Sequence, residues 1–155
     1  MPDWITHIGV VWIICTLLNI KDKYIALIGA ILPDLAKLAL VALLITGINI
    51  GDFFYPFHTP IGVFLLAVFI ASFFEEFKKA FLLLFFGTLI HLFLDALMWP
   101  WGYAGIALLF PITREEYGFN LIWPDDLRPM LLTIVGVIIV YFYLEVHKLW
   151  WQNDS

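Results

Sequence analysis

His91 and Asp95 lie four residues apart in a segment that is otherwise rich in leucine and phenylalanine. In an α-helix, positions i and i+4 stack on one face, with Cβ atoms about 5–6 Å apart. An imidazole and a carboxylate on the same face can bind one divalent cation, and this donor set suits Zn²⁺ or a similar borderline ion. A hydrogen-bonded His–Asp pair within one helical turn is the alternative interpretation.

Three further ligand-type side chains, His7, Asp34 and His58, lie in other apolar parts of the chain. Each of them also has an ordinary local interpretation. His7 could be an interfacial histidine near a helix start, and His58 could be a loop histidine. Asp34 could cap or open a helix that restarts after Pro33, or pair with Lys37.

The composition decides where such a site would lie. The 155 residues are 63% hydrophobic and 14% charged, and the mean hydropathy is +0.97. Soluble domains are about 45–50% apolar and about 25% charged, and a small domain cannot bury this much apolar surface. The net charge of −5 excludes a basic nucleic-acid-binding module, and a single cysteine, Cys15, excludes an intramolecular disulfide. Residues 1–155 are therefore expected to form one integral membrane domain.

Charged residues divide the chain into five apolar segments of roughly the 20 residues that a membrane-spanning helix needs. These segments are residues 4–20, 24–50, 60–74, 80–98 and 129–144. The second is expected to be broken at Pro33. Residues 99–127, which are rich in proline, are expected to form a long loop with an interfacial or re-entrant element at 104–110. The predicted fold is an all-α, polytopic transmembrane bundle of about five spans.

Lysine and arginine are distributed unevenly between the two sides of this predicted bundle. One side carries five lysines and the other carries two arginines, namely Lys21, Lys23, Lys78, Lys79 and Lys148 against Arg114 and Arg128. Because positive residues are enriched in cytoplasmic loops, the lysine side is expected to be cytoplasmic and the long loop to lie outside. His147 falls at the cytoplasmic end, where we expect a helix-end or interfacial role.

The expected depths of the polar residues agree with one another. Asp34 lies ten residues into the second segment, or about 15 Å from the lysine side, and His91 and Asp95 lie about 17–23 Å into the fourth. His7 and His58 lie at the outer ends of their segments. All five side chains are therefore expected to meet in the extracytoplasmic half of the bundle. Ionisable groups at membrane depth are costly, so this convergence indicates a functional site.

Five short motifs carry a resemblance to a known family. They are Thr6-His7-Ile8-Gly9, GAILPD at residues 29–34, Phe57-His58-Thr59, GTLIHLFLD at residues 87–95 and GIALLFP at residues 105–111. In their order and spacing the chain resembles the LexA-binding, inner-membrane-associated hydrolases, also called membrane-bound metal-dependent hydrolases. That family is distantly similar to zinc-dependent phospholipases C and single-strand-specific zinc nucleases.

The resemblance implies a set of ligands. One metal ion would be held by Asp34, His58, His91 and Asp95, and Asp95 would bridge to a second ion held by His7. Phe53 stands where the family commonly carries another histidine, and the soluble relatives have further histidines downstream. One or two ions are therefore expected, with Zn²⁺ favoured.

We expect a metal-dependent hydrolase of the plasma or inner membrane that acts on a lipid or lipid-linked substrate. The bound ion would activate a water molecule, with Asp34 or Asp95 orienting it. The resemblance favours a phosphoester bond, whereas the residues alone allow an acyl ester. Thr6, Thr59 and Thr88 could support the ligands or bond to their own helix backbone. The alternatives are a metal or proton pathway, or a structural subunit with polar cross-links between helices.

Overall fold

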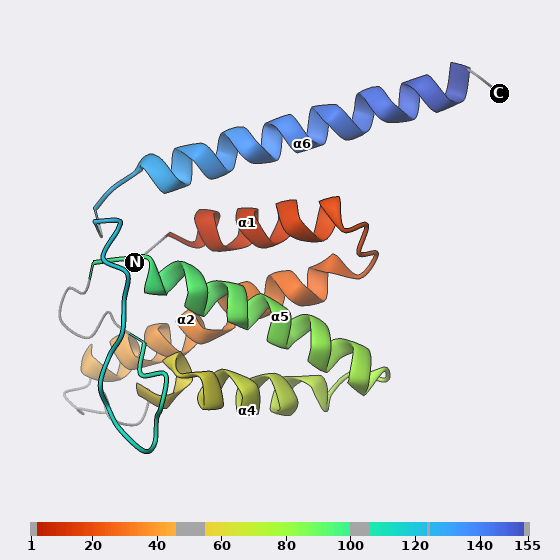
Figure 1. Cartoon of the computed structure of the whole chain (residues 1–155). Coiled ribbons are helices and arrows are strands. Elements are labelled where there is room, and N and C mark those ends of the chain that lie inside the picture. The colour runs from red at the N-terminus through yellow and green to blue at the C-terminus, as the bar shows by residue number, and fades with distance from the viewer. Residues whose placement is uncertain (1–2, 46–54, 100–105, 124, 154–155) are drawn as a thin grey trace.

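The computed structural model describes residues 3–45, 55–99, 106–123 and 125–153 (Figure 1). Within these ranges the regular structure is helical, with no strand, as the composition predicts. The elements are α1 (Trp4–Leu17), α2 (Lys23–Ile45), the 3₁₀ helix η1 (Tyr55–His58), α4 (Pro60–Ala71), α5 (Phe77–Ala96) and α6 (Arg128–Asn153).

Side-chain caps fix two of the helix starts beside the site. The Asp3 carboxylate accepts a hydrogen bond from the backbone N–H of Thr6 at 2.9 Å and begins α1. The Thr59 hydroxyl accepts from the backbone N–H of Gly62 at 3.1 Å, with Pro60 at the first helical position of α4. Both arrangements satisfy N–H groups that a helix leaves without an intrahelical partner.

Helix α5 lies at the centre of the bundle, where it packs against both α2 and α4 (Figure 1). Helix α1 packs against α2 on one side and α6 on the other. The α1–α2 turn and the start of α5 meet at the same end, where Lys79 Nζ forms an ion pair with Asp22. Successive helices therefore run in alternate directions.

The crossing of α2 and α5 depends on two glycines. A Cβ on Gly29 would lie 2.3 Å from the Leu84 carbonyl oxygen, and a Cβ on Gly87 would lie 2.0 Å from the Ala26 carbonyl oxygen. No other residue fits at either position without moving backbone. Small residues that let helix backbones approach closely are typical of membrane helix pairs.

The expected break at Pro33 is wrong, because α2 continues through this residue from Lys23 to Ile45. A proline inside a helix removes one backbone N–H and costs about 3 kcal/mol or more. Pro33 is fully buried, and the close packing of α2 on α5 holds the helix together despite this cost. Neighbouring helices commonly stabilise prolines inside membrane helices in this way.

Two helices of the described chain are long and apolar enough to cross a membrane, α5 and the first part of α6, residues Arg128–Val146. Helix α1 has 14 residues and α4 has 12. At about 1.5 Å per residue they are about 18–21 Å long, which is less than the hydrocarbon core of about 30 Å. The number of spans therefore stays a prediction.

The long loop folds back onto the end of α5. The backbone N–H of Phe119 donates to the Ala96 carbonyl at 2.6 Å, and that of Leu121 donates to the Leu97 carbonyl at 2.9 Å. In the described stretch 106–123 the chain forms turns and isolated bridges and no helix, so the expected interfacial element is not helical there. Residues 104 and 105 of that element lie outside the described chain.

Candidate metal centre

The structure brings together all five predicted ligand residues. His7 lies in the first turn of α1 and Asp34 in the middle of α2, while His58 ends η1. His91 and Asp95 lie one turn apart near the end of α5. All are buried except His58, which is half-buried. The convergence that was predicted from segment depth is therefore present in the fold.

The nitrogen–oxygen distances within the cluster fall in a narrow range. Asp34 Oδ1 lies 3.4 Å from His58 Nε2 and 3.8 Å from His91 Nε2. Asp95 lies 3.3 Å from His91 Nε2 through Oδ2 and 3.6 Å from His7 Nε2 through Oδ1. These separations exceed the usual N–H···O range of about 2.7–3.2 Å. They match the spacing of about 3.3 Å between donors that surround one tetrahedral ion at about 2.0–2.1 Å.

The donors form two overlapping groups of three. One contains His7, His91 and Asp95, and the other contains Asp34, His58 and His91. Within each group the ligand atoms lie within 4.8 Å of one another. His91 belongs to both groups, and the two oxygens of Asp95 face different histidines. The arrangement can therefore hold one ion, or two ions that share the Asp95 carboxylate.

A backbone carbonyl orients His91. The Ala30 carbonyl oxygen lies 2.7 Å from His91 Nδ1. A carbonyl can only accept, so Nδ1 carries a proton, and in the neutral ring Nε2 presents its lone pair towards Asp34 and Asp95. Metal-binding histidines are commonly held in this way by a second hydrogen bond. The sequence analysis missed Ala30, because a backbone acceptor has no side-chain type that could signal it.

His7 is held by stacking on His91. The two imidazole rings are 3.9 Å apart between centroids and lie within 12° of parallel. His7 Nε2, the ring nitrogen that faces Asp95, is buried and has no hydrogen-bond partner among the described residues. A buried polar atom without a partner is uncommon, and it points to a group that completes the site. The residues present therefore fit a divalent cation.

A family model describing the YdjM inner membrane proteins matches residues 3–153. The chain belongs to the YdjM inner membrane protein family. The match spans all five predicted ligand residues and confirms that the chain belongs to an inner-membrane protein family. Searches of curated proteins and of solved structures found no match.

The threonines beside the predicted ligands form local hydrogen bonds in this YdjM-family chain, Thr6 to a capping side chain and the other two to backbone. Thr6 Oγ1 donates to the Asp3 carboxylate at 2.9 Å. Thr59 Oγ1 donates to the Pro56 carbonyl at 2.7 Å, and Thr88 Oγ1 donates to the Phe85 carbonyl at 2.8 Å. Their hydroxyl protons are therefore not directed at the ligand residues. Of the two roles expected for these threonines, the structure shows the local one.

His58 reaches the cluster because η1 folds tightly onto the first turn of α4. A Cβ on Gly62 would lie 1.7 Å from the Pro56 carbonyl oxygen, so the contact requires glycine. The Thr59 cap fixes the same turn from the other side. A defined turn therefore positions His58 beside Asp34. His58 is not a histidine of an irregular loop.

The structure also decides two other local alternatives. Asp34 lies inside continuous α2, so a helix-capping role for it is wrong. His7 is fully buried against His91 and is not an exposed interfacial side chain. The side chain of Lys37 lies outside the described part of the chain. Arg128, the first residue of α6, donates hydrogen bonds to Asp126 and lowers the pKa of that carboxyl group.

Proposed function

We propose that this protein is an intramembrane metal-dependent hydrolase that holds one or two divalent ions, with Zn²⁺ favoured. The observation that carries the proposal is the set of nitrogen–oxygen separations of 3.3–3.8 Å among five converging side chains. They are too long for good hydrogen bonds and match donors around a shared cation. The hydrogen bond from His91 to Ala30 adds the orienting contact that metal ligands usually have.

Each ligand has a role in this proposal. Asp34, His58 and His91 would hold the first ion, with Asp95 bridging to the second ion at His7. A bound divalent ion supplies a Lewis acid and lowers the pKa of water towards about 7. The carboxylates of Asp34 and Asp95 would accept a hydrogen bond from the attacking water and orient it.

The proposed substrate is a lipid or a lipid-linked molecule with a phosphoester bond. The ligands are buried among helices of an inner membrane protein family, so a substrate with a membrane-embedded part can reach them without leaving the bilayer. The phosphoester bond follows from the resemblance to zinc-dependent phospholipases C. The loop over the end of α5 contributes Ile106, which packs with Val63 and Leu92 and limits access of bulk water.

We propose five spans, with the lysine-rich end in the cytoplasm and the metal centre in the extracytoplasmic half. Two observations support this orientation. The described helices alternate in direction, and the turn that contains Asp22 meets the start of α5 at Lys79, at the end opposite His91. Lysine enrichment marks cytoplasmic ends of membrane helices.

Metal analysis of the purified protein tests the proposal. Elemental analysis should find at least one divalent ion per wild-type chain, and His91→Ala or Asp95→Ala should remove most of it. Phe93→Ala is the matched control, because Phe93 lies between these residues on α5 and its side chain is 57% exposed. Wild-type protein that holds no metal after preparation without chelators would overturn the proposal.

Lipid turnover separates an enzyme from the other functions. Vesicles of phosphatidylglycerol and phosphatidylethanolamine should release a soluble phosphate-containing product, measured by ³¹P NMR. A chelator should stop the release, and Zn²⁺ should restore it. Metal binding without turnover would favour a metal or proton pathway, and the absence of metal would favour structural cross-links between helices.

A further inference from the structure

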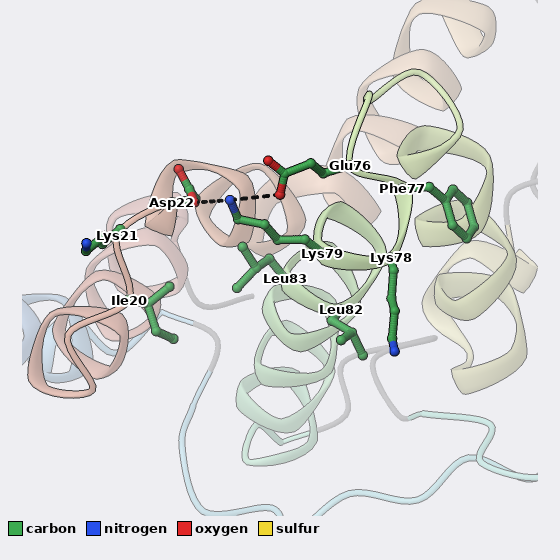
Figure 2. A pocket seen from close by; sticks show the side chains of 9 residues that line it. All are labelled: Ile20, Lys21, Asp22, Glu76, Phe77, Lys78, Lys79, Leu82 and Leu83. Atoms are coloured by element: carbon green, nitrogen blue, oxygen red, sulfur yellow. Dashed lines mark ion pairs between the residues drawn. The ribbon is translucent and has the colours of Figure 1, made fainter.

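A second candidate site lies at the other end of α5 from the metal centre. A surface pocket of about 650 Å³ opens where the α1–α2 turn meets the start of α5 (Figure 2). Lys79, which lines it, precedes His91 by 12 residues on the same helix, or about 18 Å. The pocket is therefore separate from the proposed hydrolytic site.

The charges around the pocket leave two lysines available. Lys79 Nζ forms ion pairs with both Asp22 and Glu76, as the dashed lines in Figure 2 show. Lys21 and Lys78 lie to either side and form no ion pair with any described residue. In a chain whose net charge is −5, this pocket carries more positive than negative groups.

Apolar side chains line the space between the lysines. Leu82 and Leu83 contribute from α5, and Ile20 contributes from the turn after α1 (Figure 2). Leu82 is 54% exposed. A free inorganic anion gains no binding energy from an apolar surface, whereas an acyl chain does because it removes that surface from water. The pocket thus combines cationic and apolar surfaces, as an amphiphile requires.

The position in the membrane points to the same kind of ligand. Helix α5 is one of the two helices of the described chain that are long and apolar enough to span the bilayer. It begins at Phe77, which lines the pocket. The pocket therefore lies at the end of a candidate span, at the level of the lipid headgroups. Basic pockets at this level, between helices, bind anionic headgroups.

We infer that this pocket binds an anionic phospholipid. Its headgroup lies at the rim beside Lys21 and Lys78, and an acyl chain lies along Leu82 and Leu83. The site does not depend on the hydrolase proposal, because none of its residues is a proposed metal ligand.

Native mass spectrometry of the full chain in detergent tests this inference, with phosphatidylglycerol and phosphatidylcholine titrated separately. Wild type should retain phosphatidylglycerol more tightly than phosphatidylcholine. Lys21→Gln with Lys78→Gln should weaken phosphatidylglycerol binding by about fivefold for each lysine and leave phosphatidylcholine unchanged. Arg114→Gln with Arg128→Gln removes the same charge beyond the other end of α5. This control should change phosphatidylglycerol binding less than twofold, which corresponds to roughly 0.4 kcal/mol.

Two further variants keep the test decisive. Lys21→Arg with Lys78→Arg keeps the charge and should keep the binding, even if the glutamine pair folds poorly. Leu82→Gln should weaken phosphatidylglycerol binding through the apolar surface. Equal retention of the two lipids, the same loss in the arginine control, or full binding in the glutamine pair would overturn the inference. Retention of inorganic phosphate as tight as that of phosphatidylglycerol, unaffected by Leu82→Gln, would also overturn it.

Discussion

Within the cluster, burial of the carboxylates of Asp34 and Asp95 carries the largest free-energy cost. Both carboxylates are buried, with relative exposures of 2% and 8%, and removing a charge from water costs several kcal/mol unless it is compensated. Neutral imidazoles supply hydrogen bonds or lone pairs but no charge. One divalent cation balances both carboxylates. A second ion would leave a positive excess, which would suit the anionic phosphoester that we propose as the substrate.

The three histidine variants should differ in how much metal the protein loses. His91 belongs to both donor groups, whereas His7 and His58 belong to one each. If two ions bind, we expect His7→Ala and His58→Ala each to lose about one ion per chain. His91→Ala should remove a ligand of the first ion, and it should weaken the second by about 10–100-fold because His91 stacks on His7 and orients it. Elemental analysis combined with competition by a chromophoric chelator measures both quantities.

The same series separates one ion from two. A single bound ion predicts that His7→Ala leaves the metal content of the wild type unchanged. Loss of all metal in both His7→Ala and His58→Ala would contradict the division into two groups. Leu89→Ala serves as the control, since Leu89 lies in α5 and its side chain is 41% exposed.

The α2–α5 pair links packing to the geometry of the site. Gly29 and Gly87 let the two backbones approach closely, and the same approach brings the Ala30 carbonyl within 2.7 Å of His91 Nδ1. The orientation of the His91 ring therefore depends on the separation of the two helices. A change at the crossing should affect stability and metal affinity together.

Gly87→Ala tests this coupling. Its added methyl group would meet the Ala26 carbonyl, which is backbone and cannot rotate away. We expect a loss of about 1–3 kcal/mol in the free energy of unfolding, together with about 10–100-fold weaker metal binding. Denaturant titration and chelator competition measure the two effects.

Gly136→Ala on α6 is the matched control for that change. Its methyl group would lie 3.1 Å from Ile13 Cδ1, the flexible end of a side chain. We therefore expect a much smaller loss of stability and of metal affinity. Wild-type metal affinity in a destabilised Gly87→Ala protein would show that the crossing does not orient His91.

Sequence reasoning predicted which side chains converge better than it predicted the elements that hold them. The spacing of His91 and Asp95 and the depth of Asp34 depend only on helical geometry, which is regular. Pro33 was expected to break α2 because the local rule for proline omits packing against α5. Ala30 was missed because its contribution is a carbonyl group. The α2–α5 crossing depends on contacts between residues more than 50 positions apart, and no local pattern shows which glycine meets which helix.

At the scale of the whole molecule, the two ends of the bundle differ in chemistry. One end carries the lysines of the α1–α2 turn and of early α5, together with the pocket that they line. The other end carries the candidate metal centre and the loop that folds onto α5. If the lysine end faces the cytoplasm, the proposed lipid binding and the proposed hydrolysis would occur in opposite leaflets.

Cysteine labelling tests this orientation. In a Cys15→Ala background, Gly118→Cys should react with a membrane-impermeant maleimide on sealed spheroplasts. Lys78→Cys should react only after permeabilisation. Both positions are exposed in the structure, so differences in labelling reflect the side of the membrane. Labelling of both cysteines from the same side would refute the five-span arrangement.

The order of synthesis gives the continuous helix α2 a further consequence. Asp34 leaves the ribosome 57 residues before His91, the partner that lies 3.8 Å away in the finished fold. In the proposed five-span arrangement, α2 would enter the bilayer before α5, with a carboxylate whose insertion as a charge costs about 2.5–3.5 kcal/mol. A nascent α2 is therefore least costly when Asp34 is protonated or still in contact with water. In that arrangement, insertion of α5 would add His91 and Asp95 and so complete the cluster around Asp34.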